Sequence, residues 1–457
     1  MPCICHRNRL PAQPVPHNDG IRLRSCDWTL SELRLDTECQ ERNVRSMSVT
    51  TGKQPDLDVD VIIVGSGMIG ATLAVALGGA GLRVALIDRL NPATMVGVPF
   101  DGRASAIAYA SYRALDAIGA WRHMGTEAQP ILDIRVSEAD SLLFLHYDHR
   151  ELGDGPLGFM LENRHLRRGL FAAISEITNI TLLAPSQLDR LDRTEGGVVA
   201  HLIDGLKING RLAVGADGRN SPVREAAGIR VQGWSYEQSG IVCTVAHEHP
   251  HCGVAHERFF TAGPFAILPL TGNRVSLVWT EPSAIADRLI ELEESDFNGE
   301  IRERFGDFLG YVEAVGPRWC YPLSLHNAET YIDHRLALVG DAAHGMHPIA
   351  GQGLNLGFRD VAALAEVMID AARLGLDIGS SNVLSRYEMW RRFDSMVLLA
   401  VTDGLNRLFS NDVGAVRAAR DVGLAAVNQV PPLKRFFMRH ARGTVGKLPR
   451  ILKGTAL

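Results

Sequence analysis

The sequence of 457 residues predicts an α/β protein in which a helix-covered parallel sheet carries an inserted antiparallel sheet and is followed by C-terminal helices. Three observations predict this class: a glycine-rich strand–turn–helix unit near residue 65, two later apolar strands that end in aspartate–glycine turns, and alternating apolar and polar residues between 233 and 325. The hydrophobic content of 46% and the charged content of 22% are typical of a soluble globular enzyme. A net charge of −5 argues against a nucleic-acid-binding protein, and no run of about twenty apolar residues predicts a membrane span.

The first unit is the stretch DVDVIIVGSGMIGATLAVALGGAGLRVALIDR, residues 58–89, which has the form of a strand, a helix and a second strand. Residues 59–64 are nearly all apolar, as a buried parallel strand requires. The glycines of its G-x-G-x-x-G sequence make the turn, let the backbone approach a pyrophosphate and let the helix pack closely on the strand. Asp88 ends the second strand, where a carboxylate can accept both ribose hydroxyls. We therefore predict dinucleotide binding by Gly65, Gly67, Met68, Ile69, Gly70, Asp88 and Arg89.

Two later segments repeat the plan of an apolar strand that ends in an aspartate–glycine turn. In LAVGADGRNSPVREAAG, residues 212–228, Asp217 and Gly218 follow the strand, and Ser221 with Pro222 predicts a helix start. Taken alone, this segment indicates no more than a turn. The stretch LALVGDAAHGMHPIAGQGLNLGFRD, residues 336–360, predicts a strand at 336–339, a turn at 340–341, a loop rich in free backbone N–H groups at 348–353 and a helix over about 354–368.

One long cofactor explains why the chain carries two nucleotide-type elements. FAD has an ADP end, which suits residues 65–70, and a ribityl-flavin end, which suits residues 340–355. The start of the later helix can hold a delocalised negative charge. The sequence shows no second complete fingerprint, so we expect NAD(P)H to dock transiently.

Further stretches extend the pattern: FDGRASAIAYASYRALDAIGAW (100–121), HERFFTAGPFAILPL (256–270) and RVSLVWT (274–280). Together with the three elements, they resemble in the same order the ubiquinone-biosynthesis hydroxylases, a subfamily of the FAD aromatic hydroxylases related to p-hydroxybenzoate hydroxylase. The resemblance runs from about residue 58 to the C-terminus, and it implies a Rossmann-like FAD-binding domain with an inserted antiparallel-sheet substrate domain. It also implies FAD contacts for Arg103, Asp217, Gly218, Gly340, Asp341, Pro348, Gly351, Gln352, Gly353, Leu354 and Asn355.

The activity that the resemblance implies is ring hydroxylation. NAD(P)H reduces FAD, reduced flavin captures O2 as a C4a-hydroperoxide, and this oxidant hydroxylates a polyprenylated phenol in ubiquinone biosynthesis. Three other hypotheses stay open: a hydroxylase of a small soluble aromatic acid, with Arg258 as a candidate carboxylate clamp, a flavoprotein reductase or dehydrogenase, and a non-catalytic assembly subunit. The intact glycine fingerprint and flavin loop argue against the last. The sequence assigns no catalytic base.

Histidines and cysteines offer weaker signals. The stretch HEHPHCGVAH, residues 247–256, suggests metal binding, but we favour a solvated loop and predict no metal site. His344 and His347 flank the flavin loop, and each is either a proton-transfer group or a structural histidine. The seven cysteines form no CxxC pair, which indicates free thiols in a reducing compartment.

The domain organisation follows from these segments. We predict a disordered leader at 1–57, a discontinuous FAD-binding domain at 58–129, 160–232 and 328–378, a substrate-binding β-sheet domain at 130–159 and 233–327, and a C-terminal helical region at 379–457. An alternative to a leader is that translation starts at Met47. The tail lacks acidic residues after Asp421 and is basic and amphipathic, so it is either a surface for anionic lipid or a partner, or a solvated helical cap. We expect a cytoplasmic bacterial protein, peripheral on the inner membrane face if the tail binds lipid.

Overall fold

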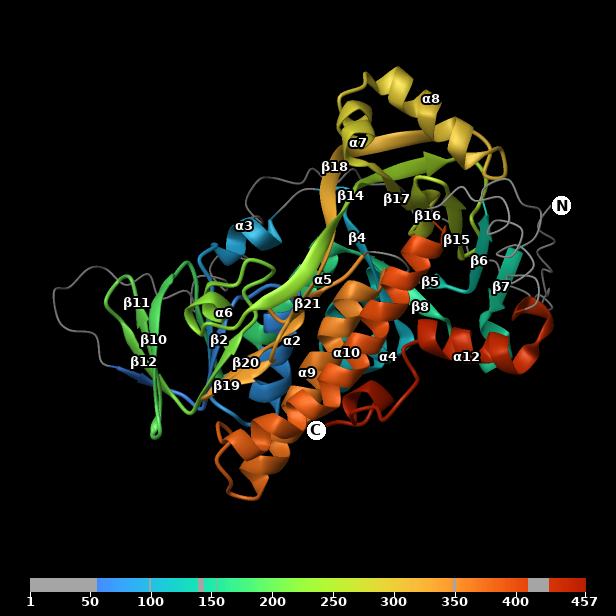
Figure 1. The fold of residues 1–457 in the computed structure, drawn as a ribbon. Helices are drawn as coiled ribbons and strands as arrows, with labels where there is room; N and C mark the ends of the chain where they lie inside the picture. The colour runs from blue at the N-terminus through green and yellow to red at the C-terminus, as the bar shows by residue number, and fades with distance from the viewer. Residues whose placement is uncertain (1–55, 98–99, 139–143, 154, 348–350, 410–426) are drawn as a thin grey trace, which may run out of the picture. The chain divides into compact units, whose positions relative to one another are not determined.

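The computed structural model describes residues 56–457 except 98–99, 139–143, 154, 348–350 and 410–426 (Figure 1). The predicted leader before residue 56 and the predicted flavin contact Pro348 lie outside the described residues.

A six-stranded sheet forms the nucleotide-binding half of the fold. Its order is β19 (Ile332–Asp333), β20 (Leu336–Leu338), β13 (Leu212–Gly215), β2 (Val61–Val64), β3 (Val84–Ile87) and β9 (Ile180–Leu183), and every neighbouring pair except β19–β20 is parallel. The inner strands consist of small and branched apolar residues that are buried on both faces, as a parallel sheet between helices requires. The helices packed in the same core are α2 (Met68–Gly79), α5 (Asn163–Ser175) and α9 (Gln352–Arg373).

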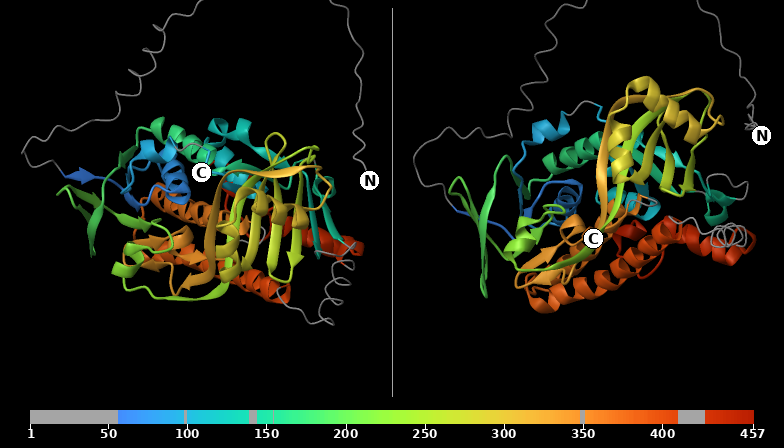
Figure 2. Two further views of the ribbon diagram at one scale, coloured as in Figure 1. Left: turned by 90° about the horizontal axis from the view of Figure 1, so that it is seen from above. Right: turned by 45° about the horizontal axis from the view of Figure 1, so that its top comes forward.

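An eight-stranded sheet forms the second half. Its order is β21 (His344–Gly345), β18 (Val312–Ala328), β14 (Val231–His247), β17 (Arg274–Pro282), β16 (Gly263–Leu270), β15 (Val254–Phe260), β6 (Asp133–Glu138) and β7 (Phe144–Asp148). The sheet is antiparallel apart from the β15–β6 pair. Its two longest strands, β14 and β18, run side by side from the neighbourhood of β20 to α7 (Ser283–Ile290) (Figures 1 and 2).

The two faces of this sheet have different partners because side chains alternate along each strand. One face packs on α7 and α8 (Glu294–Phe305), with Ile241, Phe265, Leu277 and Trp279 of the strands against Phe297, Ile301 and Phe305 of α8. The other face lines a cavity. The sequence predicted an antiparallel sheet for this interval but not its two helices, of which α8 buries apolar residues at i, i+4 and i+8.

Two small sheets complete the strands. One contains β4 (Ala104–Ala108), β8 (Gly158–Glu162) and β5 (Gln129–Ile131), and the other contains β1 (Leu57–Asp58), β12 (Lys207–Gly210), β11 (Gly197–Leu202) and β10 (Leu188–Thr194). Short helices α3 (Pro92–Val96), α4 (Tyr109–Ala117) and α6 (Pro222–Ala226) connect these elements. Strand β8 spans the predicted boundary at 159–160, and β21 from the predicted FAD-binding segment pairs with β18. The division into two domains therefore stays a prediction within a unit that covers residues 55–457.

The C-terminal region contains α10 (Ser381–Phe409) and α12 (Pro431–Ala441), and α10 packs along α9 (Figure 1). Three basic side chains of the tail are used inside the fold. Lys434 pairs with Glu151 at 2.5 Å, Arg450 pairs with Asp370 at 2.5 Å, and Arg442 donates to three backbone carbonyls of residues 152–156. Within the described residues, no helix has both the length and the hydropathy that crossing a bilayer needs.

Candidate functional site

The glycine fingerprint lies where β2 turns into α2. A Cβ on Gly65 would lie 2.4 Å from the carbonyl oxygen of Ala216, and a Cβ on Gly70 would lie 1.9 Å from that of Gly65, so packing requires both glycines. A Cβ on Gly67 would meet no protein atom within 4 Å. No side chain caps the start of α2. The turn therefore leaves backbone N–H groups open to an anion at the middle glycine, which fits a pyrophosphate.

Asp88 stands beside this turn at the end of β3. One carboxylate oxygen accepts hydrogen bonds from the backbone N–H and the hydroxyl of Ser66, at 2.6 and 2.8 Å, and the other accepts from the N–H of Leu90 at 2.8 Å. The oxygen bonded to Leu90 accepts only one bond and can accept another, so the half-buried carboxylate keeps capacity for a ribose hydroxyl. The side chain of Arg89 is exposed next to it.

The turn at Gly340 is brought against the first turn of α2. Gly340 has a φ of +60°, and a Cβ there would lie 3.1 Å from Cγ1 of Ile69. A Cβ on Gly357, in α9, would lie 2.6 Å from Cδ1 of the same isoleucine. Ile69 thus holds the two predicted nucleotide elements together, and Asp341, exposed after Gly340, lines the same cavity as Met68.

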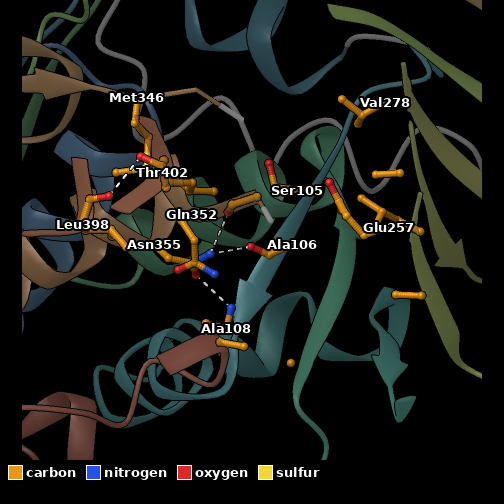
Figure 3. A pocket seen from close by; sticks show the side chains of 18 of the residues that line it. Ser105, Ala106, Ala108, Glu257, Val278, Met346, Gln352, Asn355, Leu398 and Thr402 are labelled. Atoms are coloured by element: carbon orange, nitrogen blue, oxygen red, sulfur yellow. Dashed lines mark hydrogen bonds between the residues drawn. The ribbon is translucent and has the colours of Figure 1, made fainter. Parts of the chain in front are cut away.

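This cavity of about 1520 Å³ lies between the starts of α2 and α9, strand β4 and the free face of the eight-stranded sheet (Figure 3). Helix α9 begins after Gly351, which has a φ of +60°, and no side chain caps it. Five of the predicted flavin contacts line the cavity at this helix start: Gly351, Gln352, Gly353, Leu354 and Asn355. The cavity runs from this helix start to Met68 and Ile69, beside the glycine turn, so its residues fit the ribityl-flavin half of FAD.

Asn355 uses its whole side-chain amide inside the protein (Figure 3). Its oxygen accepts from the N–H of Ala108 at 2.8 Å, and its nitrogen donates to the carbonyls of Ala106 at 2.8 Å and Gly351 at 2.9 Å. The residue therefore fixes β4 to the start of α9, a positioning role that the sequence did not predict.

Three further predicted contacts, Asp217, Gly218 and Arg103, stand outside the cavity lining. Asp217 accepts hydrogen bonds from the hydroxyl of Ser221 at 2.5 Å and the N–H of Val223 at 3.0 Å, which caps α6. Burial raises the pKa of this carboxyl although those bonds oppose the shift. Gly218 follows it with a φ of +88°. Arg103 pairs with Asp101 at 2.6 Å and lies 4.8 Å from the ring centroid of Trp319, next to the cavity-lining residues of β4.

The histidines near the flavin loop have distinct environments. His344 is buried, and its Nε2 lies 2.6 Å from Oδ2 of Asp360, whose other oxygen accepts from Arg391 at 2.8 Å. Burial disfavours ionisation of Asp360, but the charges of His344 and Arg391 outweigh it and hold the pKa of this carboxyl below its usual range. His347 is fully buried, its ring packs edge-on against Tyr236 at 5.1 Å, and neither ring nitrogen has a hydrogen-bond partner among the described residues. Burial lowers the pKa of His347 to about 4.

The histidines of residues 247–256 bond to backbone rather than to one another. His247 Nδ1 lies 2.7 Å from the carbonyl of His249, and His251 Nε2 lies 2.8 Å from that of Leu270. The ring of His256 packs against Phe308 with a centroid distance of 4.6 Å.

The sheet face that lines the cavity is apolar with one acidic exception. Ala255, Phe259, Ala266, Leu268 and Val278 line it, and so does Glu257, which the sequence did not single out. Arg258 is on the opposite face, where it donates to the carbonyls of Arg304 and Phe305 in α8. Arg258 is therefore not a clamp for a substrate carboxylate, because it does not face the cavity.

The cavity reaches the surface between α10 and α12. Its lining there is both apolar and exposed: Val397, Val401 and Leu408 of α10, and Phe436 and Phe437 of α12. We call these five residues the rim. Phe436 is 50% exposed and Phe437 is 39% exposed.

Comparison with known proteins identifies the fold and the family. Residues 58–393 match a family model described as FAD binding domain. The ubiquinone hydroxylase UbiL of Rhodospirillum rubrum is 52% identical over 88% of this chain and 94% of its own, and the 3-demethoxyubiquinol 3-hydroxylase of Escherichia coli is 36% identical over 84% and 98%. The human mitochondrial ubiquinone biosynthesis monooxygenase COQ6 is 31% identical over 86% and 94%.

Among solved structures, the p-nitrophenol 4-monooxygenase PnpA of Pseudomonas putida superposes with a TM-score of 0.72 over 86% of this chain and all of its own, at 20% identity. These matches confirm the predicted α/β class with an FAD-binding fold and C-terminal helices, and they confirm FAD as the cofactor.

Proposed function

Because the chain belongs to the FAD-dependent hydroxylases of ubiquinone biosynthesis, we propose that it hydroxylates the aromatic ring of a polyprenylated phenol with O2 and NAD(P)H. The observation that carries the substrate class is the continuous apolar cavity, which runs from the flavin-binding helix start to an exposed apolar rim. A phenol ring fits beside the helix start, and a prenyl chain can follow the sheet face outward.

We assign FAD binding to the residues that the fold brings to this cavity or to its glycine turn. They are Gly65, Gly67, Met68, Ile69, Gly70, Asp88 and Arg89 for the ADP half, and Gly340, Asp341, Pro348, Gly351, Gln352, Gly353, Leu354 and Asn355 for the ribityl-flavin half, Asn355 acting by position. Arg103, Asp217 and Gly218 would act from the adjacent turns. When bound, FAD carries electrons from NAD(P)H to O2 and delivers one oxygen atom to the ring.

The chain supplies binding, charge stabilisation and exclusion of water. The uncapped start of α9 presents N–H groups and the positive end of a helix dipole to the flavin edge. The apolar sheet face keeps water from the reacting ring, which protects a reactive oxidant from decay. The alternative hypothesis, a small aromatic acid as substrate, loses its candidate for binding the carboxylate, because Arg258 faces α8.

Contact with a membrane surface also fits the rim. A polyprenylated phenol resides in the bilayer, and the five exposed rim residues would let it enter the cavity without crossing water. The exposed Arg435 and Arg439 of α12 stand beside the rim and can meet anionic headgroups. The rim replaces the basic tail as the main element of this proposal, since three tail residues are paired within the fold.

The test is single-turnover and steady-state assay of the purified, FAD-loaded protein with a polyprenylphenol under oxygen-18 gas. We expect one oxygen-18 atom in the ring of the product, and consumption of NAD(P)H to follow its formation. Asp341→Ala should lose FAD and activity. Asp333→Ala is the matched control, because Asp333, on β19, pairs with Arg193 of β10 and does not line the cavity.

Two results would contradict the proposal. Oxidation of the prenylphenol without oxygen-18 in the product would indicate a dehydrogenase. Hydroxylation of small aromatic acids with no turnover of any prenylphenol would assign the cavity to a soluble substrate.

A further inference from the structure

Glu257 breaks the pattern of the cavity wall. On β15, alternation directs Ala255, Glu257 and Phe259 to the cavity and Arg258 to the α8 side. His256 also borders the cavity, but its ring packs against Phe308. The residues paired with Glu257 on the two neighbouring strands are Ala266 and Val136, which are apolar and also line the cavity. A carboxyl group therefore stands between two apolar, cavity-lining residues of the neighbouring strands, where sheet packing does not require a charged side chain.

The carboxyl group points from the sheet into the cavity, toward the side where Ser105 and Gln352 lie (Figure 3). The residue is about nine-tenths buried, at 9% exposure. Among the described residues it forms no hydrogen bond and no ion pair, so none of these residues compensates for its burial. A buried carboxyl without a partner is destabilising for a fold, which favours a role toward a ligand.

Burial raises the pKa of Glu257 to about 7. Other ionisable groups line the same cavity from the surrounding elements: Tyr147, Arg219, His256, Tyr321, Asp341, Arg359, Asp394 and His440. Glu138 on β6 pairs with Phe259 by strand register but does not line the cavity. No hydrogen bond or ion pair joins any of them to Glu257 in the described part of the chain. A carboxyl that titrates near neutral pH can both take up and return a proton during turnover.

We propose that Glu257 is a catalytic residue that accepts the hydroxyl proton of the phenol bound in the cavity. This inference rests on the proposed function and adds the base that the sequence does not reveal. The O–H bond of the substrate breaks, the proton binds the carboxylate, and the electron pair stays on the phenolate oxygen. A phenolate ring is richer in electrons than a phenol ring, so it reacts faster with an electrophilic oxygen. The proton returns to the phenolate oxygen of the product, and the carboxylate is regenerated.

The test compares wild type, Glu257→Gln and Glu257→Asp, each loaded with FAD, on 2-geranylphenol as the probe. For Glu257→Gln we expect ring hydroxylation at pH 7 to fall by roughly 100-fold or more. The decline of wild-type activity as the pH falls through about 7 should be absent, while flavin reduction by NAD(P)H continues and releases hydrogen peroxide. Glu257→Asp keeps a carboxyl, so it should keep the pH dependence at a lower rate.

A second probe separates proton transfer from a structural role. A ring-fluorinated 2-geranylphenol with a free target carbon is assayed at a pH where its hydroxyl is already ionised. This probe needs no base, so the difference between wild type and Glu257→Gln should shrink toward unity. The control is Glu138→Gln, which removes a buried carboxyl from the same sheet outside the cavity lining and should leave both probes unaffected.

The outcomes distinguish this inference from the proposed function. If wild type hydroxylates no prenylphenol, the proposed function fails, whatever Glu257 does. If wild type is active, two results overturn the assignment of Glu257. In the first, Glu257→Gln keeps the wild-type rate and pH dependence; in the second, its hydroxylation rate falls by the same factor on both probes.

Discussion

At the scale of single residues, Asn355 shows how the site is held. Two of its three hydrogen bonds join segments that are 247 and 249 residues apart in the chain, the third goes to Gly351, and each partner is a backbone group of the cavity wall. Removing the amide leaves buried backbone groups without partners, and each such group costs about 1–3 kcal/mol.

We therefore expect Asn355→Ala to lower the free energy of unfolding of the FAD-free protein by about 2–4 kcal/mol, measured by urea titration. FAD affinity should fall with it because the start of α9 loses its anchor. Unchanged stability with FAD binding lost would instead show that the amide acts on the cofactor directly.

The glycines of the fingerprint offer a paired prediction. Gly70→Ala places a methyl group 1.9 Å from the carbonyl oxygen of Gly65, so the backbone must move, and unfolding should become easier by about 1–3 kcal/mol. Gly67→Ala meets no protein atom within 4 Å, so the FAD-free melting temperature should stay unchanged.

Both variants should lose FAD, measured as flavin absorbance per protein. If Gly67→Ala retains FAD, the pyrophosphate does not bind at this turn.

The sequence predicted many single positions and few of their long-range contacts. The glycines and Asp341 were predictable because each is required by a local turn and a local motif. The anchoring role of Asn355 was not predictable, because its partners lie in β4, far along the chain. Glu257 had a detectable signal: in a strand over residues 255–259 it shares a face with Ala255 and Phe259, which places one acid between two apolar residues.

At the scale of elements, the rim joins α10 and α12 into one surface over the cavity. Half-exposed phenylalanines in this position are costly in water and favourable in lipid. Burying one such ring contributes about 1.5 kcal/mol or more, which is roughly tenfold in binding.

We expect Phe436→Glu to weaken binding to vesicles of phosphatidylglycerol and phosphatidylcholine by at least about tenfold in a sedimentation assay. Turnover of the short-tailed probe 2-geranylphenol, supplied in detergent without vesicles, should change little. Leu374→Glu is the matched control, because Leu374 is 73% exposed but does not line the cavity. Equal binding by both variants would exclude the rim from lipid contact.

The pattern of apolar residues along the chain predicted some helices and strands and missed others. The strands at 61–64, 84–87, 212–215 and 336–338 were predicted to within about two residues, since apolar runs and turn residues define them locally. The parallel pairing of β15 with β6 was not predicted, because it joins segments more than 100 residues apart. Helices α7 and α8 were missed inside an interval that otherwise alternates as strands do.

At the scale of the whole molecule, buried histidines make stability depend on pH. Burial lowers the pKa of His347 to about 4, and burial with the charges of Arg135 and Arg258 lowers that of His256 to about 4. Each folded pKa lies below the ordinary value of 6.5, so the unfolded chain binds more protons between these limits. Stability is therefore lost as the pH falls from about 6.5 to 4, by about 3 kcal/mol for each histidine.

We expect the melting temperature to fall over this range, and the fall to be smaller in His347→Phe, which keeps a ring against Tyr236 and removes the titration. Glu257 acts in the opposite direction between pH 4.5 and about 7, because its folded pKa is raised. Differential scanning fluorimetry of both proteins across this range measures the difference. Parallel curves for wild type and variant would show that His347 does not titrate with folding.

The open rim also bears on how the protein would select among lipids that differ only in length. A closed pocket selects ligands by length, because a chain longer than the cavity cannot bind. Among the described residues, the cavity is lined at the rim by exposed side chains, so isoprene units beyond the rim would lie outside that part of the protein, in the surrounding medium. Discrimination would then rest on the aromatic head alone, and the same enzyme would serve a cell that makes short tails as well as one that makes long tails.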